Sequence, residues 1–309
     1  MKGDMENITI ERSCPVCASR THKPFADERI EQDKLNDFSY ASRKQPEFMC
    51  LRLVQCLNCD VIYAPSPPEK EFLSNAYSEA AYDSGPEAKA AAISYAKALK
   101  PHLRQITNRE AAVDVGAGSG PLLPWLSEQG FHPVMGIEPS RAAIEAAPPN
   151  VQAMLREGMF SQELLAGIRP SLICSFMTLE HISDPSELAN TAFEVLEKNG
   201  MLAVVVHNWR APLNRALGLR SPIIDVEHLQ LFSEKSLRVL LSKAGFEKIK
   251  VNTISNSYPL RYWLRLTPLP QRLKKTITRA LEFIKIADLK IPIRVGNMIA
   301  VGVKIKEQK

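Results

Sequence analysis

Long hydrophobic runs are missing from this sequence of 309 residues. No apolar stretch approaches the ~20 residues that a helix needs to span a bilayer, so we expect no transmembrane segment. The first residues, MKGDMENITIERSC, include acids and lack an apolar core, so we expect no secretory signal. Both absences favour a cytoplasmic protein, in which cysteines stay reduced and disulfides are rare.

The charge is unevenly spread along the chain, whose net charge is +5. Residues 255–309 contain twelve Lys and Arg against three Asp and Glu, which makes this segment +9 and leaves the rest at −4. A mildly acidic body with few aromatic platforms in its basic segment argues against a nucleic-acid partner. The basic segment indicates instead that one face meets an anionic group, such as phosphate or lipid head groups.

Four of the six cysteines form two C-x-x-C pairs, Cys14 with Cys17 and Cys56 with Cys59. The two-residue spacer lets both thiolates of a pair face one tetrahedral ion, and four sulfurs complete the ligand set of a structural zinc. Unrelated cysteines or redox pairs are the alternative. A closed four-thiolate site leaves no position for a substrate, so we expect the zinc to stabilise structure only. The charge-rich stretch between the pairs, residues 26–47, is expected to loop out.

The cysteine pairs define a predicted zinc-ribbon-like domain over residues 1–66, followed by a connector with leading helices over 67–110. Prolines interrupt regular structure near residues 65–68. A helical pattern then runs from about residue 87 to 105, and its predicted buried face consists of Ile93, Ala96, Leu99 and Leu103.

From residue 111 onward, short apolar runs alternate with segments of helical periodicity. The apolar runs predict strands near residues 111–115, 132–138, 151–155, 171–177, 201–208, 247–255 and 294–306. Strands that are apolar throughout and separated by helices are typical of a mostly parallel sheet covered on both faces. We therefore expect one α/β domain over residues 111–309, with a basic helical insertion at 255–292.

Three glycines follow the first predicted strand in the stretch VDVGAGSG, at positions 116, 118 and 120. Glycines allow the backbone to pass close to a ligand, and this edge of a doubly wound sheet is where ligands bind. Glu138 ends the next strand, where a carboxylate can accept hydrogen bonds from ribose hydroxyls. The stretch therefore predicts a cofactor site, with an ordinary strand–helix turn as the alternative.

Asp114 distinguishes between the cofactors that such a loop could bind. A dinucleotide places its pyrophosphate at the helix N-terminus, usually over the spacing G-x-G-x-x-G. A carboxylate one residue before the turn would repel a pyrophosphate but attract an ammonium or a sulfonium. S-adenosylmethionine carries both cations and no phosphate, so the pattern favours it over NAD.

The chain resembles the class I S-adenosylmethionine-dependent methyltransferases over about residues 85–309. The resemblance is carried by VDVGAGSG, GIEPS, EGMF, SFMTLEHISDP, VLEKNGMLAVVVHN and HLQLFSEKSLRVLLSKAGF. With the paired cysteines it is similar to zinc-ribbon-headed sugar C-methyltransferases and to methyltransferases of bacterial polysaccharide clusters. The resemblance implies a Rossmann-like seven-stranded sheet, mostly parallel, of order 3-2-1-4-5-7-6 with an antiparallel seventh strand.

The resemblance also implies roles for single residues. The methionine part of the cofactor would be lined by Asp114, Gly116, Gly118 and Gly120. Glu138 would hold the ribose, and the adenine would lie near Gly158 and Met159. The methyl group would meet its acceptor beside the residues that follow the fourth strand, Leu179, Glu180 and His181.

Methyl transfer requires an aligned acceptor and, for some acceptors, removal of a proton. Imidazole suits this task near neutral pH, which makes His181 and His228 candidate bases with Glu227 as a partner; structural roles for both histidines are the alternative. Some sugar C-methyltransferases have Tyr-x-Glu-His at the second position, where this chain has Asp225, so their mechanism does not transfer directly. LEHISDP also resembles ubiquinone-pathway O-methyltransferases, but Met177 replaces an additional glutamate, so we expect no metal-assisted chemistry.

The basic insertion contains an apolar stripe flanked by cations. The stripe consists of Leu273, Ile277, Leu281 and Ile284, and the opposite face of Lys274, Lys275, Arg279 and Lys285. One interpretation is a lid over a phosphate-bearing or lipid-linked acceptor, and another is peripheral contact of residues 261–288 with the inner face of a membrane. A helix packed on the protein, with a solvated basic face, is the plain alternative.

The sequence as a whole predicts a methyltransferase that acts on a small sugar-like or glycolipid acceptor in cell-surface or secondary metabolism. Two alternatives stay open. The first is O-methylation of a quinone or a polyketide-like phenol. The second is a cofactor-binding assembly protein without catalytic activity.

Overall fold

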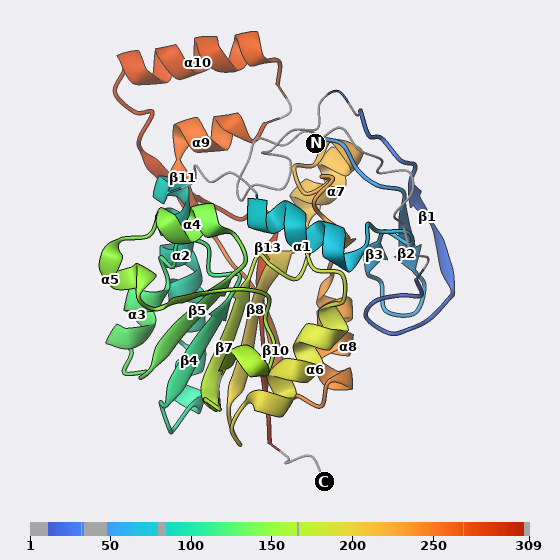
Figure 1. Ribbon diagram of the computed structural model, residues 1–309. Coiled ribbons are helices and arrows are strands. Elements are labelled where there is room, and N and C mark those ends of the chain that lie inside the picture. The colour runs from blue at the N-terminus through green and yellow to red at the C-terminus, as the bar shows by residue number, and fades with distance from the viewer. Residues whose placement is uncertain are drawn as a thin grey trace.

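The computed structural model describes residues 12–31, 33, 48–79, 85–165, 167–267 and 269–305 (Figure 1). Their strands form a seven-stranded sheet, a four-stranded N-terminal sheet and a two-stranded ribbon. Most of the charged stretch between the cysteine pairs, residues 34–47, lies outside the described residues. The predicted domain boundaries at residues 66 and 110 stay predictions.

The central sheet has the predicted topology. Its order is β6-β5-β4-β7-β8-β13-β10, which in chain order along the sheet is 3-2-1-4-5-7-6. The last strand, β13, runs antiparallel to both of its neighbours, and the other pairings are parallel. The strands are β4 (Ala111–Val115), β5 (Val134–Glu138), β6 (Leu155–Glu157), β7 (Pro170–Phe176), β8 (Met201–His207), β10 (Glu247–Thr253) and β13 (Asn297–Val303).

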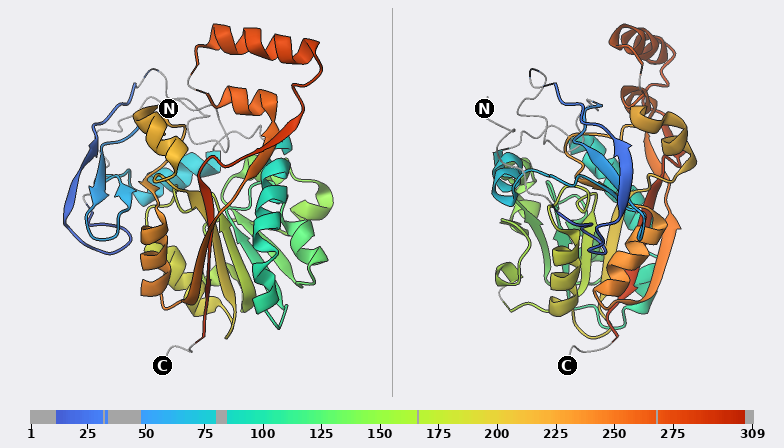
Figure 2. Two further views of the ribbon diagram at one scale, coloured as in Figure 1. Left: turned by 180° about the vertical axis from the view of Figure 1, so that it is seen from behind. Right: turned by 90° about the vertical axis from the view of Figure 1, so that its right-hand side faces the viewer.

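Helices cover both faces of this sheet (Figures 1 and 2). Alternate residues of β4 point to opposite faces, so Val113 and Val115 pack with helices α6 and α8, while Ala112 packs with α2 and α3. Burial on both faces explains why the inner strands β4, β5, β7, β8 and β13 are mostly apolar, whereas the edge strands β6 and β10 are partly exposed. The helices are α2 (Gly85–Leu99), α3 (Leu123–Glu128), α4 (Arg141–Glu145), α5 (Pro149–Gln152), α6 (Pro185–Val195), α7 (Pro212–Leu217) and α8 (Glu234–Lys243), with single 3-10 turns at His102–Gln105, Glu163–Leu165 and Gly218–Arg220.

Two local predictions are wrong. Residues 151–155 were expected to be a strand, but Pro149–Gln152 is the short helix α5 and β6 begins only at Leu155. Pro149 occupies the first turn of α5, where its fixed φ and missing N–H favour a helix start. On the predicted helical face, Ala96, Leu99 and Leu103 are buried, but Ile93 is 65% exposed, and α2 buries Ala92 and Tyr95 in its place.

The N-terminal sheet packs against the main domain. It contains β1 (His22–Ala26), β2 (Leu53–Cys56), β3 (Ile62–Tyr63) and the distant β9 (Gln230–Leu231), which pairs with β3. The guanidinium of Arg12 donates hydrogen bonds to the carbonyls of Ala64, Ser183 and Leu229. The cysteine region is therefore continuous with the core beside α6 and α8. Helix α1 (Lys70–Glu79) follows this sheet.

The predicted insertion before the last strand is present. It consists of β11 (Asn256–Pro259), α9 (Leu260–Arg265), α10 (Gln271–Phe283) and β12 (Lys290–Ile293), with β11 and β12 paired antiparallel. Helix α10 lies above α9 at the end of the molecule in every view (Figures 1 and 2). The predicted stripe is only partly covered, because Leu273 and Ile284 are 45% and 57% exposed. Among the described residues, no helix combines the length and apolar character that spanning a membrane requires.

Candidate active site

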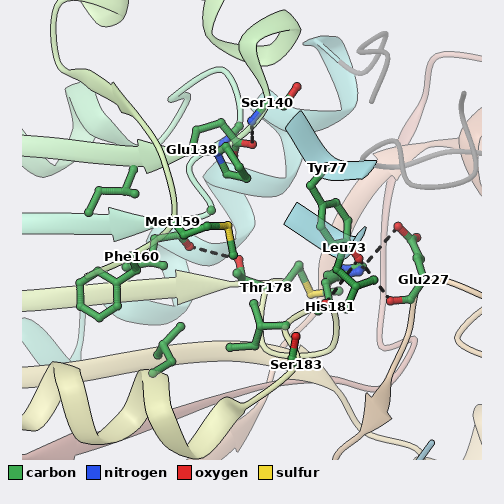
Figure 3. Close-up of a pocket in the computed structure, with 18 of the residues that line it drawn as sticks. Leu73, Tyr77, Glu138, Ser140, Met159, Phe160, Thr178, His181, Ser183 and Glu227 are labelled. Atoms are coloured by element: carbon green, nitrogen blue, oxygen red, sulfur yellow. Dashed lines mark hydrogen bonds and ion pairs between the residues drawn. The ribbon is translucent and has the colours of Figure 1, made fainter. Parts of the chain in front are cut away.

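A cavity of about 360 Å³ opens at the carboxyl ends of the parallel strands. Loops after β4, β5, β6 and β7 form its walls, together with α1, the segment before β9, and α9. Figure 3 shows Glu138 and Ser140 toward one end, and Tyr77, His181 and Glu227 toward the other. The doubly wound sheet thus brings residues distant in sequence to one edge, where ligands of this fold class bind.

Glu138 is the central residue of the first end. Its Oε2 accepts a hydrogen bond from the N–H of Gly118 at 2.7 Å, and its Oε1 accepts one from the N–H of Ser140 at 2.9 Å. Burial raises the pKa of Glu138, and the two N–H groups oppose that rise. The carboxylate is therefore held in one orientation between the glycine loop and the start of α4.

The three glycines adopt backbone conformations that other residues rarely adopt. Their φ angles are +74° at Gly116, +56° at Gly118 and +67° at Gly120. A Cβ on Gly116 would lie 2.3 Å from Oγ1 of Thr178, so this glycine also permits close packing of the loop on the end of β7. A Cβ on Gly118 would meet nothing within 4 Å and would instead extend from the cavity lining.

Other predicted cofactor residues divide into two groups. Gly158 and Met159 line the cavity beside Phe160. The second group, Asp114, Gly120, Leu179 and Glu180, is not among the lining residues. Burial, together with the nearby carboxylate of Glu138, raises the pKa of Asp114 to about 8, so Asp114 is mostly neutral at pH 7 in the cofactor-free protein. The individual roles implied for these residues stay predictions.

Histidines and carboxylates gather at the second end of the cavity. Nδ1 of His181 lies 3.6 Å from Oε2 of Glu227. The ring of His228 lies 4.9 Å from that of His181 and 5.3 Å from that of His207, centroid to centroid. The candidate catalytic residues predicted from TLEH and VEH are thus neighbours, although 46 positions separate Glu227 from His181 in the sequence.

Glu180 anchors this cluster from below the cavity surface. It is fully buried, and its Oε1 accepts a hydrogen bond from the backbone N–H of His207 at 2.7 Å. Burial alone would raise the pKa of Glu180, but the hydrogen bond and charge interactions with His207, aided by His181 and His228, lower it. An ionised Glu180 therefore stabilises positive charge on the surrounding imidazoles.

His228 has a defined tautomer in this arrangement. Its Nδ1 lies 2.9 Å from the carbonyl oxygen of Ile223, which can only accept, so Nδ1 carries the proton and Nε2 is free of one. Burial, with smaller contributions from the charges of His181 and His207, lowers the pKa of His228 to about 4. His228 is consequently neutral at pH 7.

Two residues at this end of the cavity were not predicted from the sequence as site residues. His207 ends β8, and its position at the carboxyl end of a central strand was an available signal. Tyr77 comes from α1, and its hydroxyl lies 3.5 Å from the backbone oxygens of His181 and Glu227. No local pattern indicated that α1, from the connector, would cover the cavity.

The four paired cysteines form a separate cluster in the N-terminal sheet. The Sγ atoms of Cys14 and Cys59 are 3.4 Å apart, those of Cys17 and Cys56 are 3.5 Å apart, and all four lie within 4.8 Å of one another. Tetrahedral zinc with Zn–S bonds of ~2.3 Å separates its sulfurs by about 3.8 Å, so the donor set fits zinc. None of the four lines the cavity, which agrees with a structural metal.

His181, Glu227 and His228 also place one ligand atom each within 4.8 Å of one another. This geometry is compatible with a cation at the second end of the cavity. The expectation drawn from Met177, that no metal assists the chemistry, therefore stays a prediction.

Comparison with known families identifies the class of the protein. A family model described as "Methyltransferase domain" matches residues 90–251, which is just over half of the chain. The chain belongs to this family, and its sheet has the order that the resemblance implies for the class. The protein is an S-adenosylmethionine-dependent methyltransferase.

Solved structures with a similar fold include methyltransferases from several sources. One is an S-adenosylmethionine-dependent methyltransferase from Thermotoga maritima, a possible histamine N-methyltransferase (18% identity, 70% of this chain and 90% of that one, TM-score 0.45). Another is an S-adenosylmethionine-dependent methyltransferase from Archaeoglobus fulgidus (14% identity, 69% of this chain and 94% of that one, TM-score 0.46). A third is the plantazolicin methyltransferase BpumL in complex with S-adenosylhomocysteine (17% identity, 77% of this chain and 91% of that one, TM-score 0.48). These likenesses concern the fold alone. No curated protein matches the sequence.

We predict that Glu138→Gln weakens binding of S-adenosylhomocysteine by about ten- to a hundred-fold, because an amide cannot accept from both N–H groups and binds a ribose less strongly. Isothermal titration calorimetry measures this. The matched control is Glu157→Gln, since Glu157 pairs with Glu138 across the parallel strands but is exposed and bonded to Arg141. Equal losses in both variants would contradict the assignment of Glu138.

The raised pKa of Asp114 predicts a pH dependence of stability. Asp114 binds its proton up to about pH 8 when folded but only to about pH 4 when unfolded, so the folded state holds more protons between these values. The free energy of unfolding of the cofactor-free protein should therefore fall as the pH rises from 4 to 8. Asp114→Asn should flatten this slope in chemical denaturation; an unchanged slope would refute the shift.

The cysteine cluster predicts about one zinc per chain by elemental analysis. Cys59→Ser should lose the metal and lower the unfolding midpoint by roughly 5–15 °C, because metal binding contributes directly to folding. Cys50→Ser is the control, since Cys50 is also buried in this region but lies outside the cluster. Full zinc retention in Cys59→Ser would exclude the four-thiolate site.

Proposed function

We propose that the protein transfers a methyl group to a hydroxyl-bearing, sugar-like acceptor, either free or part of a glycolipid. The observation that carries this proposal is the pairing of His181 with Glu227 at the end of the cavity away from Glu138. An alcohol is a weak acid, and its methylation needs a positioned base in a way that easily ionised acceptors do not.

S-adenosylmethionine, when bound, supplies the methyl group on a sulfonium that is a good leaving group. Glu138 and the glycine loop would hold its ribose end, and the buried Asp114 lies just before that loop. The remaining work of the protein is to orient the acceptor, to exclude water and to receive a proton.

His181 is the residue best placed to receive that proton. Its Nδ1 faces Oε2 of Glu227 at 3.6 Å, and in this proposal its Nε2 receives the proton of the acceptor hydroxyl. Glu227 stabilises the imidazolium that forms, and the buried Glu180 adds a second negative charge nearby. Tyr77 and α1 cover the pair and reduce its contact with water.

The acceptor end of the cavity is lined by three imidazoles and by the carboxyl groups of Asp225 and Glu227. This lining suits a polar, polyhydroxylated group better than an apolar quinone. Hydrogen-bonding side chains left without partners beside an apolar ligand would incur a desolvation cost. This consideration favours the sugar-like acceptor over a quinone or a phenol, and the class of acceptor can be tested directly.

The test supplies methyl-labelled S-adenosylmethionine with sugar nucleotides, glycolipid extracts, and phenols including quinols, and identifies the products by mass spectrometry. Label in a sugar-bearing product supports the proposal. Label confined to phenols contradicts it in favour of the quinone or polyketide alternative. Cofactor binding without any labelled product contradicts it in favour of an assembly protein. A parallel series with a chelator shows whether a cation takes part.

With a working acceptor, Glu227→Gln and His181→Asn should lower kcat by about a hundred- to ten-thousand-fold, as expected for removal of a general base and its partner. Cofactor affinity should change less than about three-fold, because both residues lie at the acceptor end. His22→Asn is the control, since His22 is an exposed residue of β1 outside the cavity. A kcat unaffected by both substitutions would remove His181 and Glu227 from the mechanism.

A further inference from the structure

The insertion contains a second cavity, separate from the catalytic one. It is an open cleft of about 340 Å³ between α9 and α10, which lie one above the other in Figure 1. Its lining consists of Arg261, Leu264, Arg265, Gln271, Lys274, Lys275, Thr278 and Arg279. We call this feature the basic cleft.

The basic cleft concentrates positive charge. Five of its eight lining residues are Lys or Arg, and no carboxylate stands among them. Arg261 forms an ion pair with Asp288 at 2.7 Å, but both side chains are mostly exposed, so this pair neutralises the cleft little. Burial, and then the charge of Arg265, lowers the pKa of Lys274. Like charges are therefore held together, an arrangement that a bound anion would stabilise.

The basic cleft adjoins the catalytic cavity through a single helix. Tyr262 and Leu266 line the cavity at the α9 end, while Arg261 and Arg265 line the cleft on another face of α9. The Arg265 guanidinium lies 6.0 Å from the centre of the Tyr262 ring. A helix with its side chains is about 10 Å across, so one elongated molecule could reach both sites.

We propose that the basic cleft binds a phosphate or diphosphate group of the acceptor while its sugar-like part occupies the cavity. This inference rests on the proposed function. Arginine presents a planar array of donors that matches phosphate oxygens, and lysine adds point charge. The cleft then selects glycosyl phosphates over free sugars.

The phosphate can come from a soluble nucleotide-linked sugar or from a lipid-linked sugar. The same insertion exposes apolar side chains outside the cleft, with Phe283 87%, Ile284 57% and Leu289 55% exposed. These residues would suit a lipid-linked source, whereas the cleft itself serves both. The phosphate chemistry is common to the two, and separate probes distinguish them.

The experiment measures binding of the full-length chain to two kinds of probe. Inorganic pyrophosphate and uridine diphosphate glucose are titrated by calorimetry, and vesicles of phosphatidylglycerol are compared with vesicles of phosphatidylcholine by co-sedimentation. The double variant Lys274→Met/Arg279→Met removes two cleft cations. Its matched control, Arg272→Met/Lys290→Met, removes two exposed cations of the same insertion that do not line the cleft.

We expect the cleft variant to bind at least one probe about ten-fold or more weakly, and the control to stay within about two-fold. A selective loss with soluble diphosphates supports a nucleotide-linked source, and a selective loss with phosphatidylglycerol vesicles alone supports a lipid-linked source. Unchanged binding in the cleft variant, equal losses in both variants, or no binding by the wild type would overturn the proposal.

Each variant is also titrated with S-adenosylhomocysteine and melted, so that altered folding is recognised. Because the probes are bound without methyl transfer, failure of the basic cleft is distinguishable from failure of the proposed function. A protein that methylates free sugars but ignores every phosphate probe would retain the function and lose the cleft.

Discussion

The site depends on one carboxylate held between two backbone N–H groups. Glu138 ends β5, and its oxygens accept from Gly118 on one side and Ser140 on the other. This contact joins the glycine loop to the turn that begins α4, and it fixes the conformation in which Gly118 has a positive φ. A Cβ on Gly118 would meet nothing within 4 Å, so the loop leaves open space there, and the orientation of the carboxylate is fixed before any cofactor binds. Preorganisation of this kind lowers the conformational cost of binding.

The same sheet also determines which residues meet at the second end of the cavity. β7 and β8 are parallel neighbours, so the segment carrying Glu180 and His181 ends beside His207, and β9 brings Glu227 and His228 to the same edge. Because β9 pairs with β3, the zinc-ribbon-like sheet also fixes the segment that carries two candidate catalytic residues. A metal bound by the four cysteines would therefore act on the position of His228 and Glu227 through this sheet, without taking part in the chemistry.

Much of the fold could be predicted from the sequence, because buried parallel strands are continuously apolar and glycines end the helices. The prediction of a strand at residues 151–155 is wrong because Pro149 starts a short helix, and the apolar Val151 in that helix resembles a strand residue. The prediction for Ile93 is wrong because α2 buries Tyr95, while Ile93 is exposed. Sequence motifs were sufficient to identify Glu138, Glu180–His181 and Glu227–His228 as candidate site residues. The basic insertion was predicted as one that could meet a phosphate-bearing acceptor, but its cleft between α9 and α10 was not. Tyr77 and His207 were not predicted as site residues, because their positions depend on which distant segments the topology brings together, and no local spacing encodes that.

A structure of the protein with S-adenosylhomocysteine bound would test the central claim most directly. The account predicts that the ribose hydroxyls lie within hydrogen-bonding distance of the Glu138 carboxylate and that the sulfur points along the cavity toward His181. The Gly118 loop should keep its present conformation, because Glu138 already holds it. A ligand bound elsewhere, or a sulfur directed away from His181 and Glu227, would contradict the division of the cavity into a cofactor end and an acceptor end.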